Sequence, residues 1–270
     1  MNAPKPITSL TNDRVKAIRA LEMRKVRKET GLFVAEGTSL LITARENGFV
    51  PETLVYQAGS ADSGMYRGLV TWALKENAEV LEVSEAVLAK LASKDNPQTM
   101  LGVFRQRFVP LPELKKISKD ATWLALEEVR DPGNLGTILR TADGVGCAGV
   151  ILVGICCDPY ALECVRATMG SIFAVPLVKL DRELFLNFAK SWPGDVVATH
   201  LDASADFRKV SYRAPELLVM GGEGPGLSDA LAKASTRRVK IPMAGELDSL
   251  NLAIATALTL YQIRGNRLKI

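Results

Sequence analysis

The sequence predicts an α/β protein with two units, the second of which is built on a mostly parallel β-sheet with helices on both faces. A chain of 270 residues with 47% hydrophobic content can bury one large core or two modest ones. In the first half, short apolar segments typical of strands alternate with segments of helical periodicity. In the second half, the strand-like segments are continuously apolar, as in parallel strands that are covered on both faces.

The first half begins with a basic amphipathic segment. Between residues 12 and 28, Val15, Ile18 and Leu21 recur at helical spacing, and basic residues occupy the other faces. We expect one helix there, ended by Gly31. The elements expected after it are strands at 33–35, 54–56, 80–83 and 101–105, and helices at 40–47, 66–76 and from 85 onward with Ser84 as N-cap.

A linker is expected between two domains. Residues 108–120 contain two prolines and three lysines, and they interrupt the apolar pattern on both sides. We therefore predict an N-terminal domain over residues 1–107 and a C-terminal domain over residues 121–270. Its expected elements are strands at 123–126, 150–153, 175–178, 196–199, 217–220 and 239–241, and a long apolar helix at 252–263.

Composition excludes several classes of protein. No apolar stretch reaches about 18 uncharged residues and the N-terminus does not resemble a signal peptide, so we expect a cytoplasmic protein without a membrane segment. The four cysteines include the adjacent pair Cys156 and Cys157, which suits a disulfide poorly, and we interpret all four as reduced core thiols. The single histidine, His200, excludes a histidine-based zinc cluster, and we expect no metal. His200 follows an apolar run, which predicts a structural role at a strand end.

Positive charge is concentrated at the N-terminus. The net charge is +4, yet residues 1–30 alone hold eight lysines and arginines against three acidic residues. A local cationic surface suits a polyanion such as RNA, although charge alone would favour a solvated helix face. The residues that we expect to contact RNA are Arg14, Lys16, Arg24, Lys25, Arg27, Lys28 and Arg166.

One glycine pattern is excluded as a nucleotide site. Residues 144–149 have the G-x-G-x-x-G spacing of dinucleotide-binding folds, but they follow an expected helix and precede an expected strand. The dinucleotide fingerprint requires the opposite order, so that a helix N-terminus receives the pyrophosphate. We interpret these glycines as the end of a helix.

The first of three loops that could carry chemistry is residues 131–143, here called the first loop. It directly follows an expected strand, and its proline and glycines indicate a turn from strand to helix. Asn134 is a candidate N-cap of that helix. Arg140 would then lie about one and two-thirds turns into the helix, outside its apolar stripe.

Two further loops also follow expected strands. The second loop, residues 220–229, has four glycines around Glu223, which lets a backbone approach a ligand closely. The third loop, residues 241–251, places Ser249 and Asn251 where a strand end turns into the long apolar helix. Together the three loops predict one composite polar site.

These loops resemble, in chain order, the three sequence motifs of the SpoU/TrmH family of RNA ribose 2′-O-methyltransferases. The third loop matches nearly residue for residue, and the first has the Asn-x-Gly of the family followed by an arginine six residues after the asparagine. Residues 165–176 resemble a further family segment, with Thr168 where serine is commoner. Residues 9–37 resemble the substrate-binding domain that precedes the catalytic domain in many members and is similar to small RNA-binding ribosomal proteins.

The resemblance implies a trefoil-knotted α/β catalytic domain, a homodimer in which helix 252–263 forms the contact, S-adenosylmethionine as cofactor, and ribosomal or transfer RNA as substrate. Matched position by position, it implies cofactor contacts from Met220, Gly221, Gly222, Ile241, Met243 and Leu250. It implies a reaction site lined by Asn134, Arg140, Glu223, Ser249 and Asn251.

In this family Arg140 would activate the 2′-hydroxyl either as a base or by fixing the neighbouring phosphate. Because a guanidinium with a pKa above about 12 is a poor proton acceptor near neutrality, our hypothesis makes Arg140 a phosphate and oxyanion clamp. Glu223 and Asn134 would then hold the loops, and Ser249 and Asn251 would orient the ribose.

Two other functions remain as alternatives. One is a non-catalytic knotted RNA-binding factor, which the presence of all five polar site residues argues against. The other is a methyltransferase that modifies a base nitrogen. The Ser-Leu-Asn sequence of the third loop, together with Asn134 and Arg140, favours the ribose oxygen instead.

Overall fold

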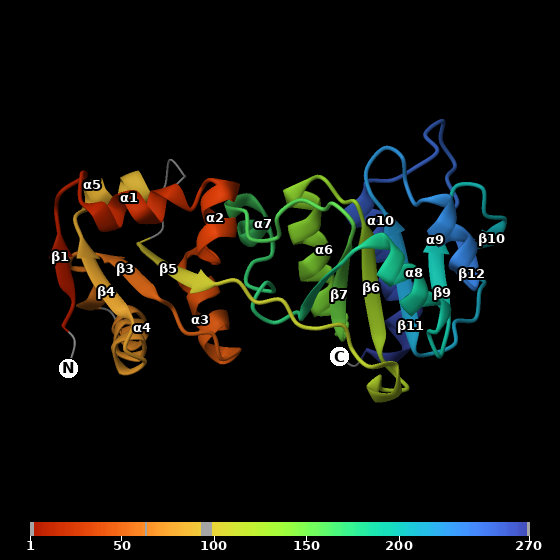
Figure 1. Cartoon of the computed structure of the whole chain (residues 1–270), viewed down its shortest axis with the longest axis horizontal. Helices are drawn as coiled ribbons and strands as arrows, with labels where there is room; N and C mark the ends of the chain where they lie inside the picture. The colour runs from red at the N-terminus through yellow and green to blue at the C-terminus, as the bar shows by residue number, and fades with distance from the viewer. Residues whose placement is uncertain (1–2, 63, 93–98, 269–270) are drawn as a thin grey trace. The chain divides into compact units, whose positions relative to one another are not determined.

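The computed structural model of the protein describes residues 3–62, 64–92 and 99–268. The chain divides into two compact units, each made of two segments. Unit 1 consists of Met1–Gln106 and Asp158–Ala174, and unit 2 of Arg107–Cys157 and Val175–Ile270. Figure 1 shows both units with their elements labelled.

Unit 1 is a five-stranded mixed sheet with helices on both faces (Figure 1). Its strands, in the spatial order β1-β4-β3-β5-β2, are β1 (Lys5–Ile7), β2 (Leu32–Glu36), β3 (Thr53–Gln57), β4 (Glu79–Val83) and β5 (Met100–Arg105). Its helices are α1 (Asp13–Ala20), α2 (Arg24–Thr30), α3 (Thr38–Glu46), α4 (Gly64–Lys75), α5 (Glu85–Leu91) and α7 (Leu162–Ala167), with a 3-10 turn η1 (Ser60–Asp62). The four strands and the later helices expected here are confirmed, whereas the short β1 was not expected.

The single helix expected over residues 12–28 is wrong, because the structure breaks it between α1 and α2. The buried guanidinium of Arg27 folds back, and its Nη1 donates to the carbonyl oxygens of Leu21 at 2.8 Å and Glu22 at 2.7 Å. A continuous helix would have used these two oxygens in its own ladder. The apolar spacing still identified the inward face, since Val15 and Ile18 are buried.

Residues 158–174 were expected in the C-terminal domain, but the structure packs them with unit 1. Two ion pairs tie this excursion to the N-terminal residues. Arg27 pairs with Asp158 at 2.8 Å, and the buried Glu36 pairs with Arg166.

Aromatic rings complete this packing. The ring of Phe173 lies 5.8 Å from that of Phe33 and 5.0 Å from that of Phe104, and the ring of Tyr160 lies 4.6 Å from Phe33. Rings at such separations are in favourable contact. The excursion therefore supplies part of the core of unit 1.

Unit 2 is a seven-stranded sheet in which every pairing is parallel. Its strands, in the spatial order β10-β12-β9-β11-β6-β7-β8, are β6 (Thr122–Glu127), β7 (Gly149–Val153), β8 (Leu177–Leu180), β9 (Val196–Thr199), β10 (Ala205–Asp206), β11 (Glu216–Gly221) and β12 (Arg237–Lys240). Its helices are α6 (Pro132–Gly144), α8 (Arg182–Lys190), α9 (Asp229–Ala234) and α10 (Leu252–Arg264), with 3-10 turns η2 (Leu114–Lys116) and η3 (Gly265–Arg267).

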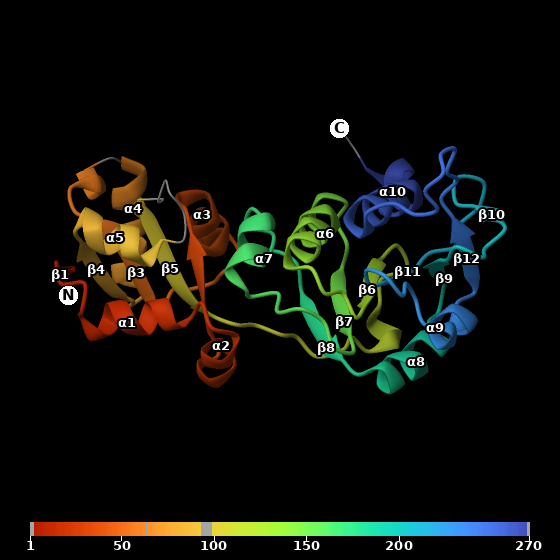
Figure 2. The same ribbon diagram turned by 90° about the horizontal axis from the view of Figure 1, so that it is seen from above.

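Helices cover both faces of this sheet, as expected. Figure 2 shows α6 and α10 on one face and α8 and α9 on the other. The strands β6, β7 and β9 each bury nearly every residue, whereas β12 near the edge of the sheet has two exposed arginines. The glycine-rich residues 144–149 end α6 and begin β7, which confirms their interpretation as a helix end.

The segment expected as a linker packs onto unit 2. Val109, Leu111, Leu114 and Ile117 are partly buried against its core, and the amide of Val109 donates to the carbonyl of Leu177 at 2.8 Å.

Among the described residues, no helix is long and apolar enough to cross a membrane.

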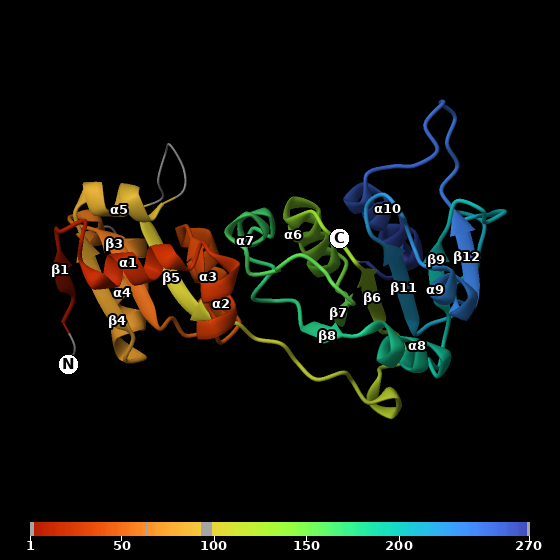
Figure 3. The same cartoon turned by 45° about the horizontal axis from the view of Figure 1, so that its top comes forward.

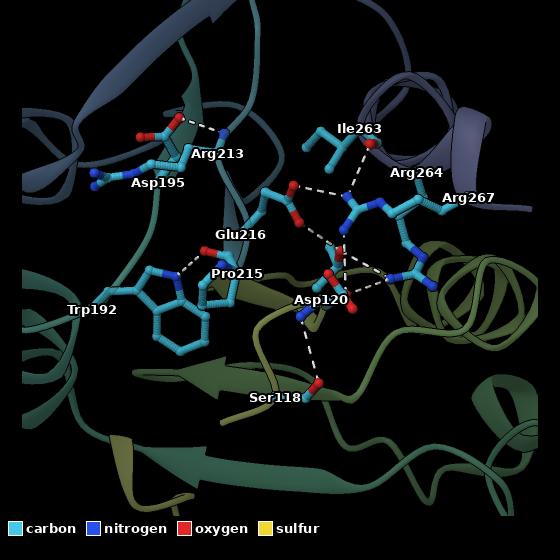
Figure 4. Close-up of polar contacts among 11 residues, drawn as sticks. Ser118, Asp120, Trp192, Asp195, Arg213, Pro215, Glu216, Ile263, Arg264 and Arg267 are labelled. Atoms are coloured by element: carbon cyan, nitrogen blue, oxygen red, sulfur yellow. Dashed lines mark hydrogen bonds and ion pairs between the residues drawn. The ribbon is translucent and has the colours of Figure 1, made fainter. Parts of the chain in front are cut away.

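A buried carboxylate anchors the end of the chain (Figure 4). Glu216, at the start of β11, is 1% exposed, and its oxygens accept from Arg267 Nη2 at 2.8 Å and Thr122 Oγ1 at 2.9 Å. Arg264 Nη1 donates to Thr122 Oγ1 at 3.2 Å and to the carbonyl oxygen of Asp120 at 3.3 Å. The last turn of α10 is thereby tied to the starts of β6 and β11.

Replacing Arg267 tests this anchor. Arg267→Ala leaves the buried carboxylate of Glu216 without its ion pair, so it should lower the free energy of unfolding by about 3 kcal/mol. Urea denaturation followed by circular dichroism measures the change. Lys116→Ala, which removes the solvent-exposed pair with Glu113, is the control and should cost less than about 1 kcal/mol. Equal effects of the two variants would contradict the anchoring role.

Candidate functional site

The first, second and third loops meet at the carboxyl ends of β6, β11 and β12. In parallel sheets these ends lie along one edge, where ligands usually bind. Figures 1 and 3 show the third loop between β12 and α10 as a long connection that extends away from the sheet. Most of its residues are exposed to solvent.

The first loop turns into α6 one turn earlier than expected. Asp131, and not Asn134, is the N-cap, because its Oδ1 accepts from the backbone amide of Asn134 at 2.6 Å. Pro132 occupies the first turn, where its missing N–H has no cost. This cap leaves the side chain of Asn134 free for contacts with the other two loops.

Asn134 joins the three loops through its carboxamide. Its Nδ2 donates to Glu223 Oε1 of the second loop at 2.8 Å, and its Oδ1 accepts from Asn251 Nδ2 of the third loop at 2.9 Å. The other oxygen of Glu223 accepts from the backbone amide of Arg130 at 2.9 Å. Because donor and acceptor are both used, the orientation of the carboxamide is determined by its partners.

Asn251 also begins α10. Its Oδ1 accepts from the amides of Ala253 at 2.8 Å and Ile254 at 3.3 Å, which satisfies two of the free N–H groups at the helix start. The same side chain thus caps a helix and contacts Asn134.

A cavity of about 500 Å³ opens beside these contacts. This volume is typical of a small-molecule or cofactor site. Of the eleven residues that the sequence assigned to the reaction or the cofactor, ten line it: Asn134, Met220, Gly221, Gly222, Glu223, Ile241, Met243, Ser249, Leu250 and Asn251.

Arg140 is the one that does not line the cavity. It lies on the exposed side of α6, outside the buried stripe of Ile138, Leu139 and Ala142. Its distance from Asn134 along the helix axis is about 9 Å for six residues.

The glycines of the second loop permit a close return of the chain. A Cβ on Gly221 would lie 2.0 Å from the carbonyl carbon of Gly226, and one on Gly222 would lie 2.3 Å from the carbonyl oxygen of Glu128. No side chain fits at either position. The glycines therefore compact the loop itself, in addition to exposing backbone to the cavity.

A carboxylate that the sequence analysis missed holds the far end of the second loop. Glu127, 2% exposed at the end of β6, accepts from the amide and the hydroxyl of Ser228, each at 2.8 Å, and from Arg182 Nε at 2.7 Å. Nothing in the local pattern distinguishes Glu127 from Glu128. The contact depends on β6 and β11 being neighbours in the sheet.

The residues directly after β9 form a further part of the cavity wall that the sequence pattern did not predict. Thr199, His200, Leu201 and Asp202 line it there. The only signal was the position of His200 behind an apolar run.

The basic residues assigned to RNA lie in unit 1 and fall into two groups. Arg14, Lys16, Arg24, Lys25 and Lys28 are exposed on α1 and α2. Arg27 and Arg166 are instead engaged with Asp158 and Glu36, and Arg27 is only 4% exposed.

The ionisation of Glu223 follows from its contacts. Burial raises the pKa of its carboxyl, but hydrogen bonds from the amide of Arg130 and the side chain of Asn134 favour the charged form and outweigh burial. The net pKa lies below the ordinary value of 4.5. The carboxylate is therefore an acceptor at neutral pH.

Replacing Glu223 should change how stability depends on acidity. Because its pKa is lower in the folded than in the unfolded protein, its ionised form stabilises folding above about pH 4.5, and this contribution is lost as the pH falls through the folded value. Melting temperatures measured from about pH 3 to 7 should therefore fall less steeply on acidification in Glu223→Gln than in the wild type. The exposed Glu183→Gln is the matched control, and an equal slope in both variants would refute the assignment.

Comparisons with known proteins agree with this geometry. Residues 121–261 match the SpoU rRNA Methylase family, and residues 12–102 match the MRM3-like substrate binding domain. A crystal structure of an AdoMet-bound rRNA methyltransferase from Sinorhizobium meliloti is 44% identical, with a TM-score of 0.90 over 98% of this chain and 99% of that one.

Two curated relatives are similar along most of their length. The 23S rRNA (guanosine(2553)-2′-O)-methyltransferase RlmP of Bacillus subtilis is 29% identical over 97% of this chain and 100% of its own. The 23S rRNA (uridine(2479)-2′-O)-methyltransferase of Streptomyces viridochromogenes is 29% identical over 88% of this chain and 84% of its own. The chain belongs to the SpoU rRNA methylase family.

Proposed function

We propose that this protein transfers a methyl group from S-adenosylmethionine to a ribose 2′-hydroxyl of ribosomal RNA. The observation that carries the proposal is the cavity in which the three loops converge, joined through the carboxamide of Asn134. The two curated relatives modify ribose hydroxyls of 23S rRNA on different bases, guanosine and uridine. This supports ribose chemistry over modification of a base nitrogen.

The cavity fits the cofactor in size and in its lining. It combines apolar surface from Met220, Ile241, Met243 and Leu250 with the exposed backbone of a glycine-rich loop. When bound, S-adenosylmethionine supplies an electrophilic methyl on a sulfonium. The ribose oxygen would take this methyl as the thioether leaves and the hydroxyl proton passes to water, which would give a 2′-O-methyl ribose and S-adenosylhomocysteine.

The protein's own contribution is alignment. Fixing the reacting groups in line can supply about 7 kcal/mol or more of the barrier. Glu223, Asn134 and Asn251 hold the loops in register, and Ser249 and Asn251 lie where hydroxyl and carboxamide groups can orient a ribose.

The position of Arg140 supports a role as a phosphate clamp rather than as a proton acceptor. It lies on the exposed side of α6 and outside the cavity lining, where a guanidinium can hold a phosphate of an RNA strand that enters the site. A guanidinium also accepts a proton poorly near neutral pH.

RNA is bound by unit 1 in this proposal. The match to a substrate-binding domain covers α1 and α2, where Arg14, Lys16, Arg24, Lys25 and Lys28 are exposed. Phosphate contacts by such residues give sequence-independent affinity. Arg27 and Arg166 are left out of the contact set, because their side chains are largely buried in ion pairs with Asp158 and Glu36 within unit 1.

We further propose a homodimer, a trefoil knot in unit 2 and a cytoplasmic location, as the family resemblance implies. The dimer contact is assigned to α10, whose exposed residues Ile254, Leu258 and Tyr261 follow the i, i+4, i+7 spacing of one helix face. An exposed apolar stripe of this kind suits a partner surface.

Methylation of ribosomal RNA by the purified protein tests the proposed function. Incubation with labelled S-adenosylmethionine should introduce one alkali-resistant 2′-O-methyl linkage. Asn134→Ala breaks the contacts among the three loops and should lower kcat by about 100-fold. Asn187→Ala, an exposed asparagine on α8, is the matched control and should be fully active. Methylation of a base, or full activity of Asn134→Ala, would reject the proposal.

The substitution Arg140→Lys distinguishes a phosphate clamp from a proton acceptor at this position. Lysine keeps the charge but loses the bidentate geometry, so a clamp predicts that kcat/KM for RNA falls about tenfold with an unchanged pH-rate profile. Steady-state kinetics at several pH values measures both quantities. Residual activity with a shifted pH-rate profile would identify residue 140 as the proton acceptor instead.

A further inference from the structure

The only histidine of the chain, His200, directly follows β9. In the sheet order β12-β9-β11, β9 lies between the strands whose ends carry the expected cofactor residues. β9 ends at Thr199, and His200 follows it directly. The carboxyl end of β9 therefore forms the middle of the cavity wall, and both residues line it.

The backbone holds His200 in place. Its amide donates to the carbonyl of Val239 on β12 at 3.0 Å, and its carbonyl accepts from Ala203 at 3.1 Å, which closes a turn over residues 200–203. The side chain is 21% exposed. The imidazole is thus partly buried, at the border between the core and the solvent.

The hydrogen bonds of the ring identify its tautomer. Nδ1 accepts from the backbone amide of Asp202 at 3.2 Å, so in the neutral ring the proton is on Nε2. Among the described residues, no protein acceptor is recorded for that Nε2–H. One ring nitrogen is therefore committed to the turn, and the residue that carries the other lines the cavity.

The sheet order also indicates which part of the cofactor His200 meets. The reaction residues Asn134 and Glu223 follow β6 and β11, and β9 lies on the other side of β11 from β6. To react beside Asn134 and Glu223, the methyl group would have to lie at their end of the cavity, and the non-reacting part of the cofactor would then extend toward β9. That part carries ring nitrogens and hydroxyl oxygens that accept hydrogen bonds.

We propose that His200 is a cofactor-binding residue whose Nε2–H donates a hydrogen bond to the non-reacting part of S-adenosylmethionine. This inference rests on the proposed function and adds to it a residue that the sequence analysis interpreted as structural. His200 contributes affinity for the cofactor and takes no part in proton transfer from the ribose.

Two substitutions of His200 test its two ring nitrogens separately. His200→Asn keeps an acceptor for the amide of Asp202, since asparagine forms the same type of turn, but it lacks the donor at the Nε2 position. His200→Gln can place its amide NH₂ near the Nε2 position but loses the Nδ1 acceptor. A contact with the cofactor is therefore impaired by asparagine and spared by glutamine, whereas a purely structural role shows the reverse.

Calorimetric titration of the full-length protein with S-adenosylhomocysteine is the first measurement. His200→Asn should weaken binding by about fivefold, as expected for one net hydrogen bond, and His200→Gln should bind within about twofold of the wild type. Melting temperatures without ligand show that each variant is folded, and Asn187→Ala is the baseline. Equal affinity of His200→Asn and wild type would overturn the inference.

The single histidine permits a second readout. The wild-type protein has one imidazole, so its ring signals in a proton–nitrogen spectrum need no assignment among histidines. Adding S-adenosylhomocysteine should shift the Nε2 signal. Binding without any shift would reject the His200 contact alone, whereas failure of the wild type to bind would reject the proposed function as well.

Discussion

The carboxamide of Asn134 is the contact on which the site depends. One of its ends donates to Glu223 and the other accepts from Asn251, so three loops from distant parts of the chain are held in one arrangement. Asp131 makes this possible by capping α6 and leaving Asn134 uncommitted. At the opposite end of unit 2, Glu216 and Arg267 hold the last turn of α10, the helix that begins at Asn251. The position of Asn251 is thereby set from both ends of its helix.

Local sequence patterns predicted the elements of the fold well, because burial on both faces leaves a continuous apolar run that does not depend on distant residues. The strands of unit 2 at 123–126, 150–153 and 196–199 were recognisable for that reason, whereas the two-residue β10 leaves too short a pattern. The break before Arg24 was not predictable, since it depends on Arg27 reaching back to two carbonyl groups. Helical spacing records which face is buried and not where the helix stops.

In the candidate site too, local patterns predicted some residues, whereas others depend on distant parts of the chain. The three loops stood out by their composition, and ten of the eleven assigned residues line one cavity. Glu127 and His200 did not stand out, because each acquires its environment from the order of strands in the sheet. A glutamate at the end of an apolar strand looks the same in the sequence whether or not Ser228 is close enough to donate hydrogen bonds to it. Arg140 was identified by its place in a motif and its exposed side by the apolar stripe, but its absence from the cavity lining emerged only from the structure.

The excursion of residues 158–174 has a consequence for how the chain folds during synthesis. Unit 1 receives Asp158, Arg166 and Phe173 from a segment made only after the first strands of unit 2. Until that segment leaves the ribosome, Arg27 and Glu36 lack the partners that neutralise them in the interior. Unit 1 therefore cannot be completed before the first strands of unit 2 have been made, unlike domains that fold one after another as they emerge. A nascent chain stopped before residue 158 would carry an unfinished first unit, even though all five strands of its sheet had been made.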